Sequence, residues 1–267
     1  MSDFFATDFT HPLPFLLFTG TTFLIIFLRY LIISGVYHFV FYRWLRPHFQ
    51  YRIINLDPKT HLQYRKEVTR SAITSSIFAI SGTALLILWQ KGWTGIYLNW
   101  GAYPLWYLPI SLLIAMLIHE TYYYWLHRWM HRPRVYRIIH KWHHESIETS
   151  SMTSFSFHPI ESILQALMIP ILIVFLPMHL GVLMLFLVIM TISATINHAG
   201  VEVYPTGFNQ HWLGKWIIGS SHHDLHHKEF RYNFGLYFTF WDRWMKTESP
   251  KSDAWFEQHT KKSKRRD

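Results

Sequence analysis

The 267-residue sequence contains no cysteine. This absence excludes disulfides, thiolate metal sites and cysteine nucleophiles, so any metal must be held by histidine, carboxylate or water. Charged residues are also scarce, at 15% of the chain, against roughly 25% in ordinary soluble domains. Half of the residues are hydrophobic and 18% are aromatic. Because the apolar residues stand in long blocks, the composition favours an integral membrane protein, whose solvent is the bilayer.

Four apolar blocks organise the chain. Those near 14–42, 71–90 and 105–126 each suit one span of roughly 20 helical residues. The fourth, near 160–196, lacks Lys and Arg and is too long for one span. Its central Pro170, Pro177 and Gly181 predict a helical hairpin that turns near 176–181. We therefore predict an all-α, integral membrane helix bundle that forms a single membrane domain over residues 1–267.

The basic residues predict the orientation of this bundle. Apart from Arg29 and Lys91, every Lys and Arg falls in 43–70, 128–141 or 215–266. With three spans and a returning hairpin, all three regions lie on one side, which the positive-inside bias assigns to the cytoplasm. The N-terminus is then outside, and residues 251–267 form a basic cytoplasmic tail. Basic loops explain the net charge of +9 without a nucleic-acid partner.

Histidines are concentrated in the second half of the chain, with fourteen of the 19 between residues 119 and 227. On a helix, spacings of three and four residues place side chains on one face. Three groups show these spacings: His127 and His131; His140, His143 and His144; His223, His226 and His227. Burying so many imidazoles costs free energy unless each finds a partner. The number exceeds the needs of one zinc ion and predicts two metals at the cytoplasmic end of the bundle, within a metal-binding catalytic core at 105–250.

Further histidines extend these groups. His119 shares the helix face of His127, and His158 and His198 are single candidates. His222 lies four residues before His226, so either His222 or His223 has the spacing to partner His226. The HxxHH pattern favours His223, which leaves His222 to orient a ligand or accept a proton.

Carboxylates near these histidines are candidates for a supporting role. A metal-bound histidine usually donates its other N–H to a carboxylate or carbonyl, which fixes the ring. Four acidic residues are near enough in sequence to accept such bonds: Glu120, Glu145, Asp224 and Asp242.

The runs HRWMHRP, HKWHH, SFHP, NHAG, GSSHHDLHH and YNFGLYFTFWDRWM resemble the sterol desaturase/fatty acid hydroxylase superfamily of membrane di-iron proteins, across roughly residues 65–250. TSFSFHPIES and the later WDR are most similar to C-5 sterol desaturases and C-4 sterol methyl oxidases. The resemblance implies two iron ions, O2 as co-substrate, an external electron donor, and hydroxylation or desaturation of a sterol-like or long-chain lipid. The implied ligands are His127, His131, His140, His143, His144, His198, His223, His226 and His227.

The resemblance leaves one ligand position open. Some relatives place a further histidine four residues after the one that matches His198, where this chain has Glu202. Glu202, His158, His222 or water is then the candidate for a tenth ligand.

No electron-transfer motif accompanies the histidines. The chain has no GxGxxG or P-loop lysine motif, and neither His11-Pro12 nor His158-Pro159 is followed by Gly-Gly as in fused cytochrome b5 domains. Reducing equivalents are therefore expected from a separate cytochrome b5-type or ferredoxin-type carrier with its reductase. The expected location is a bacterial inner membrane or the endoplasmic reticulum.

Two other classes of function fit a histidine-rich membrane chain. A transporter or other non-catalytic metal-binding protein would place its polar residues near the bilayer midplane and often shows inverted repeats, which are not apparent in this sequence. A zinc-dependent membrane hydrolase would need an open metal position and a general base, but no electron donor.

Overall fold

The computed structural model describes residues 7–55 and 60–262. The last five residues of the predicted basic tail, and Lys59 of the first basic region, lie outside this part of the chain.

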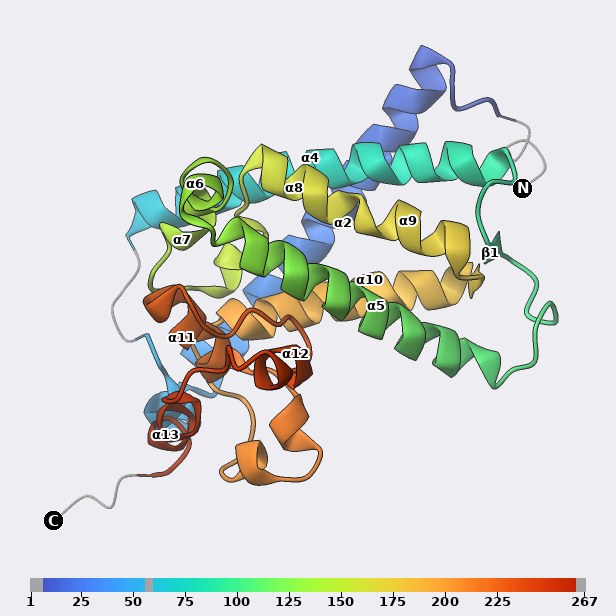
Figure 1. Ribbon diagram of the computed structural model, residues 1–267. Helices are drawn as coiled ribbons and strands as arrows, with labels where there is room; N and C mark the ends of the chain where they lie inside the picture. Colours follow the sequence, from blue (N-terminus) through green and yellow to red (C-terminus); the bar gives the residue numbers. More distant parts are fainter. Residues whose placement is uncertain (1–6, 56–59, 263–267) are drawn as a thin grey trace, which may run out of the picture.

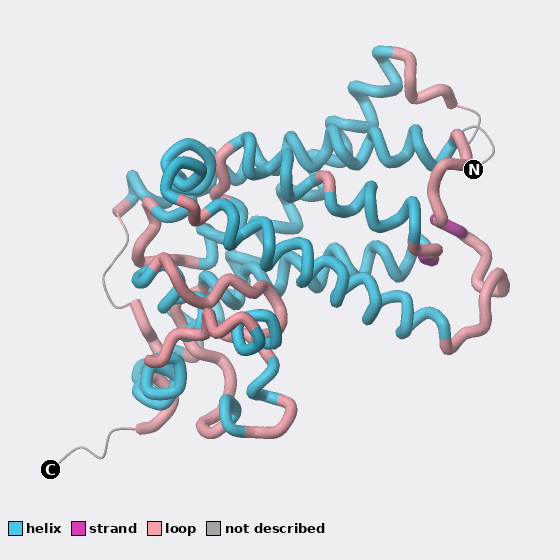
Figure 2. Tube along the Cα trace, viewed as in Figure 1, coloured by secondary structure: helices cyan, strands magenta, loops and turns pink. Residues whose placement is uncertain are grey.

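Long helices packed side by side form the body of the molecule (Figure 1). They are α2 (Pro12–Phe39), α4 (His61–Gln90), α5 (Tyr107–Met130), α8 (Pro159–Ala166) with α9 (Met168–Phe175), and α10 (Leu180–His198). The described residues contain two very short strands, β1 (Ile96–Tyr97) and β2 (Met178–His179), which pair in parallel (Figure 2). The prediction of an all-α membrane bundle is confirmed.

Three helices are long and apolar enough to cross a membrane: Pro12–Trp44, which continues α2 through a π-helical turn, α4, and α10. The α8–α9 pair is apolar but shorter. Helix α5 forms where the third span was predicted but does not join these three. Its second half carries His119, Glu120 and three successive tyrosines, which lower its hydropathy.

The apolar block at 160–196 forms the predicted hairpin. Helix α9 ends at Phe175, and α10 begins at Leu180 after the two residues of β2. The first arm is broken between α8 and α9 because Pro170 has no N–H to bond the carbonyl of Ala166. That carbonyl accepts a hydrogen bond from the Ser81 hydroxyl at 3.3 Å instead.

Short helices gather at one end of the bundle (Figure 1). As the Arg132-Pro133 pair predicts, α5 ends at Met130, and α6 begins at Pro133. The labelled helices at this end are α6 (Pro133–Val135), α7 (Lys141–His144), α11 (Ser220–Glu229), α12 (Phe240–Trp244) and α13 (Ser252–Gln258). The remaining short helices are α3 (Arg46–Phe49), the π-helical Val40–Trp44 and Tyr136–His140, and the 3-10 turns Gln50–Arg52, Ser151–Phe155, Phe208–Gln210 and Gly214–Trp216.

Helix α4 extends further toward this end than predicted. Residues 61–70, expected within a basic connection, form its first turns. They place Glu67 in the interior, where its carboxylate accepts hydrogen bonds from the hydroxyls of Ser146, Ser150 and Thr153 at 2.8–3.0 Å. A buried charge needs several such donors. Glu67 therefore fixes the loop that follows α7.

Candidate metal centre

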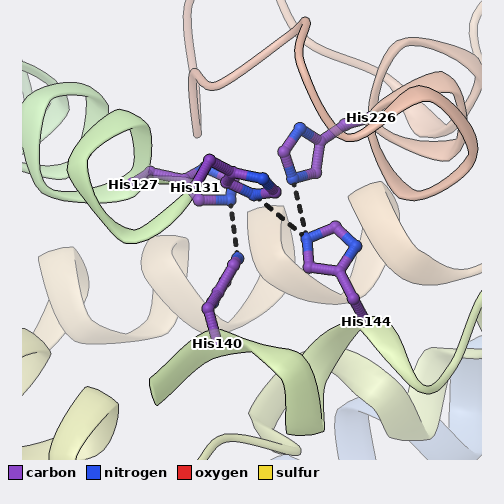
Figure 3. A group of neighbouring side chains, drawn as sticks. All are labelled: His127, His131, His140, His144 and His226. Atoms are coloured by element: carbon purple, nitrogen blue, oxygen red, sulfur yellow. Dashed lines mark hydrogen bonds between the residues drawn. The ribbon is translucent and has the colours of Figure 1, made fainter. Parts of the chain in front are cut away.

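The nine histidines predicted as metal ligands lie together at the capped end of the bundle, in two groups. Within each group the facing nitrogen atoms all lie within 4.8 Å of one another. The five-histidine group, drawn in Figure 3, contains His127, His131, His140, His144 and His226. The four-histidine group contains His143, His198, His223 and His227. All except the partly exposed His131 are buried.

Each HxxHH motif supplies both groups. His140 and His144 face the first group, whereas His143 faces the second. In α11 the middle histidine of the motif, His226, belongs to the first group, whereas His223 and His227 belong to the second. His223 and His226, expected to be partners, therefore belong to different groups. The two groups are in contact, with the rings of His144 and His227 centred 4.5 Å apart.

Backbone carbonyls fix the tautomers of three of these histidines. The Nδ1 of His127 donates to the carbonyl of Phe234 at 2.9 Å, and those of His198 and His226 donate to Ala194 and Tyr232, each at 2.7 Å. A carbonyl oxygen can only accept, so Nδ1 carries the proton in each neutral ring. The Nε2 lone pairs of these three rings then face the groups and are free to bind a metal.

The imidazoles of His127 and His140 face each other through their Nε2 atoms. Their Nε2 atoms lie 3.1 Å apart. The Nδ1 of His140 lies 2.9 Å from a carboxylate oxygen of Glu161, although the two atoms are not aligned as a hydrogen bond. The proton of His127 is on Nδ1, so the lone pair of its Nε2 faces the Nε2 of His140. A cation bound by both Nε2 atoms would suit this arrangement.

Burial keeps the histidines of the two groups neutral. It lowers the pKa of His143 and His144 well below the ordinary value for histidine, and neighbouring imidazoles lower it further. The pKa values of His226 and His227 in α11 are lowered for the same reasons. Metal binding requires the neutral ring, so these side chains are in the required protonation state across the neutral pH range.

Three other predicted histidines lie outside both groups. The Nδ1 of His119 lies 2.8 Å from the hydroxyl of Tyr237. His158 caps α8, where its Nδ1 accepts the N–H of Ile160 at 3.3 Å. His222 is buried, and neither of its ring nitrogens has a hydrogen-bond partner among the described residues.

Glu202 also lies outside the two groups. Its carboxylate accepts hydrogen bonds from the backbone N–H and the hydroxyl of Ser221, at 2.9 and 2.6 Å, and from the N–H of Tyr204. It therefore binds one of the free N–H groups at the start of α11, where a negative charge is favoured by the helix dipole. None of Glu202, His158 and His222 occupies a tenth position in the groups.

The predicted carboxylates support the centre indirectly. Asp242 accepts the N–H groups of Phe234 and Gly235, both at 2.9 Å, and burial raises its pKa to about 6. Glu120 accepts the N–H of Leu236 at 3.1 Å and that of Tyr237 at 2.7 Å. Together they hold the loop whose Phe234 carbonyl fixes His127. They thus act through the backbone and bind no histidine directly.

The other two predicted carboxylates, Asp224 and Glu145, pair with basic side chains near the metal centre. Asp224 accepts hydrogen bonds from Lys228 at 2.8 Å and from the indole of Trp255 at 3.1 Å, which ties α11 to α13. Glu145 forms ion pairs with Lys66 and Arg70 of α4. Both residues therefore position helices around the centre.

The carboxylate nearest a candidate ligand, Glu161, was not predicted from the sequence. It lies in α8, and its partner His140 is 21 positions earlier in the chain, so no local spacing links them. The available signal was a lone acidic residue at the start of an apolar block, where burial demands a partner.

Comparisons with known proteins identify the family of this chain. The model of the fatty acid hydroxylase family matches residues 112–247, which include all nine histidines of the two groups. The Delta(7)-sterol 5(6)-desaturase of Gibberella zeae is 32% identical over 189 residues, covering 69% of this chain and 57% of the relative. Human lathosterol oxidase is 30% identical over 220 residues, covering 80% of this chain and 72% of the relative. A Candida albicans Delta(7)-sterol 5(6)-desaturase is 29% identical over 202 residues, with 73% and 49% covered.

The chain spans between 49% and 72% of the lengths of these relatives. No solved structure matches it.

Proposed function

The chain belongs to the fatty acid hydroxylase family, and on that premise we propose that it is an oxidoreductase that hydroxylates or desaturates a membrane lipid at a two-iron centre. The observation that carries the proposal is the convergence of nine histidines into two contacting groups. A site with this many imidazoles and no thiolate suits Fe, Cu or Zn. The resemblance of the histidine motifs to a superfamily of di-iron proteins favours iron.

The two groups would each hold one iron ion. The first ion would be bound by His127, His131, His140, His144 and His226, and the second by His143, His198, His223 and His227. Bound iron supplies the activation of O2 and the oxidation of an unactivated C–H bond, which protein side chains alone cannot perform.

The chain's own residues prepare this centre. The carbonyls of Phe234, Tyr232 and Ala194 hold three rings with Nε2 facing inward. The carboxylate of Glu161 lies 2.9 Å from Nδ1 of His140, on the opposite side of its ring. Aromatic side chains pack on the outer rings: Phe157 lies 5.0 Å from His143, and Phe230 lies 4.9 Å from His144, between ring centres. These contacts exclude water and leave the ligands little freedom to move.

The substrate class follows from the relatives and from the membrane bundle. The relatives are named for the oxidation of sterols, so a sterol-like lipid is the first candidate, and a long-chain lipid is the alternative. The chemistry requires O2 and electrons from a separate cytochrome b5-type or ferredoxin-type carrier with its reductase. The basic regions near the metal centre favour a cytoplasmic location for this centre. There they would attract an acidic electron carrier.

The decisive experiment measures metal and turnover together. We expect the purified protein to contain two irons per chain with a Mössbauer spectrum of a coupled pair. In nanodiscs with a reductase and carrier, it should consume O2 on addition of a Δ7-sterol. The His143→Ala variant should lose iron from the second group and lose turnover. One tightly bound zinc per chain, without O2 consumption, would overturn the proposal in favour of a hydrolase.

A further inference from the structure

The segment between α10 and α11 carries a large exposed apolar surface. Trp212 is 68% exposed, Leu213 49% and Ile217 38%, and Trp244 of α12 is 61% exposed. An exposed apolar surface of this kind marks a contact with another apolar phase. The name "apron" is used below for residues 205–217 together with Trp244.

The apron lies beside the bundle and does not extend beyond its end. Ile217 pairs with Phe238 in an antiparallel bridge, and Ile218 donates its N–H to the carbonyl of Tyr237 at 3.0 Å. The N–H of Tyr237 is bound in turn by Glu120 of α5. Glu120 precedes the last residue of α5 by ten positions, which is roughly 15 Å along a helix. In Figure 1 the apron, in orange, accordingly projects to one side of the long helices.

A cavity lies between the apron and the helices. It has a volume of about 190 Å³ and is lined by Met116 of α5, Ser193 and Ile196 of α10, and Ile217, Tyr237 and Phe238. Helix α10 is long and apolar enough to span a membrane. The cavity therefore lies beside the last two turns of this candidate span.

Neighbouring side chains continue the apolar surface and add positive charge. Leu117, about one turn before Glu120 in α5, is also exposed. The charged groups of Lys215 and Arg243 lie over the ring of Trp216, 5.1 and 5.5 Å from its centre. Tryptophan beside a cation is typical of the boundary between lipid headgroups and acyl chains.

We propose that the apron is embedded in the leaflet on the side of the metal centre, with Trp212 and Leu213 inserted among the lipids. The cavity then opens sideways into that leaflet beneath Ile217, and a lipid enters it without passing through water. The embedding stands independently of the proposed function, whereas the entry route rests on it. A soluble carrier has no access to a surface at this depth, because the bilayer surrounds the adjoining spans.

The absence of native cysteine allows a direct test. The Leu213→Cys variant is labelled with the fluorophore NBD and placed in phosphatidylcholine vesicles that contain some phosphatidylglycerol. We expect a doxyl-labelled lipid to quench the fluorescence strongly and aqueous iodide to quench it weakly. Leu24→Cys on the span α2, 55% exposed, provides the lipid reference. Lys251→Cys, whose side chain is 68% exposed, provides the water reference.

Two outcomes would overturn the embedding. Iodide quenching as strong as that of the Lys251 label would place the apron in water. Shielding from iodide without quenching by the doxyl lipid would show that a second copy of the chain covers the apron. Neither result depends on iron or turnover, so the outcome is separable from a failure of the proposed function.

The entry route is tested by narrowing its mouth. The Ile217→Trp variant should lower kcat/KM for the Δ7-sterol about tenfold with the iron content unchanged. The matched control is Ile147→Trp, at another exposed position that is not part of the cavity lining, and it should retain the original value. An unchanged kcat/KM in Ile217→Trp would show that the lipid enters elsewhere.

Discussion

His140 and Glu161 form a pair in the interior, with Nδ1 of the imidazole 2.9 Å from a carboxylate oxygen and both side chains at most 1% exposed. The carboxylate lies on the side of the ring opposite the five-histidine group. An ionised carboxylate at this place would orient the ring and increase the electron density on Nε2, which faces His127.

The Glu161→Gln variant should bind iron 10- to 100-fold more weakly, which is the usual effect of losing such a carboxylate. The size of the side chain is kept, so the change reports the loss of charge. Equilibrium dialysis against a graded iron chelator measures the affinity. Glu145→Gln removes a carboxylate that pairs with Lys66 and Arg70 at the edge of the fold and should leave the affinity within about twofold. Equal effects of the two changes would refute a specific role for Glu161.

Three neighbouring histidines in α11 are predicted to behave differently. His227→Ala leaves three histidines in its group and His226→Ala leaves four, so the loss of iron should be greater for His227→Ala. His222 belongs to neither group, and His222→Ala should retain both irons. Iron content after gel filtration, with Mössbauer spectroscopy, measures each case. Retention of two irons by His227→Ala would contradict the assignment of the second group.

Glu67 is predicted to stabilise the fold without contacting the centre. Glu67→Ala leaves the buried hydroxyls of Ser146, Ser150 and Thr153 without their acceptor, at a cost of about 3–5 kcal/mol. The expected result is a large fall in thermal stability in detergent. Glu257→Ala, which removes an exposed pair with Lys261, should change the free energy of unfolding by less than about 0.5 kcal/mol. Similar losses in both variants would show that the Glu67 network contributes little.

Gly235 tests the loop that fixes His127. A Cβ at this position would lie 2.6 Å from the carbonyl oxygen of Phe238 and 2.9 Å from the Glu120 carboxylate. Gly235→Ala should therefore destabilise the protein by about 1–3 kcal/mol and weaken iron binding, because the loop must shift. Gly20→Ala in α2, where the added Cβ meets nothing within 4 Å, should be neutral or slightly stabilising. Thermal unfolding and iron titration of both variants provide the comparison.

The lengths of the apolar blocks were sufficient to predict the helix bundle. Apolar length gave α2, α4 and the hairpin that turns between Phe175 and Leu180, because a bilayer imposes a minimum helix length. Helix α5, also predicted as a span, is less apolar than the three candidate spans, since its apolar first half continues into His119 and Glu120. Apolar length also placed the start of α4 too late, because the buried partners of Glu67 are about 80 residues away in the chain.

By itself, the sequence determined that this cysteine-free chain forms a membrane bundle, and its repeated histidine spacings predicted a two-metal centre. Only the tertiary structure decided how those histidines divide. His143 and His144 are adjacent in the chain but face different groups, as do His226 and His227. Successive helical residues point about 100° apart, so the division depends on where α5 and α10 bring His127 and His198. The same packing brought Glu161 to His140 and placed the apron beside the candidate spans.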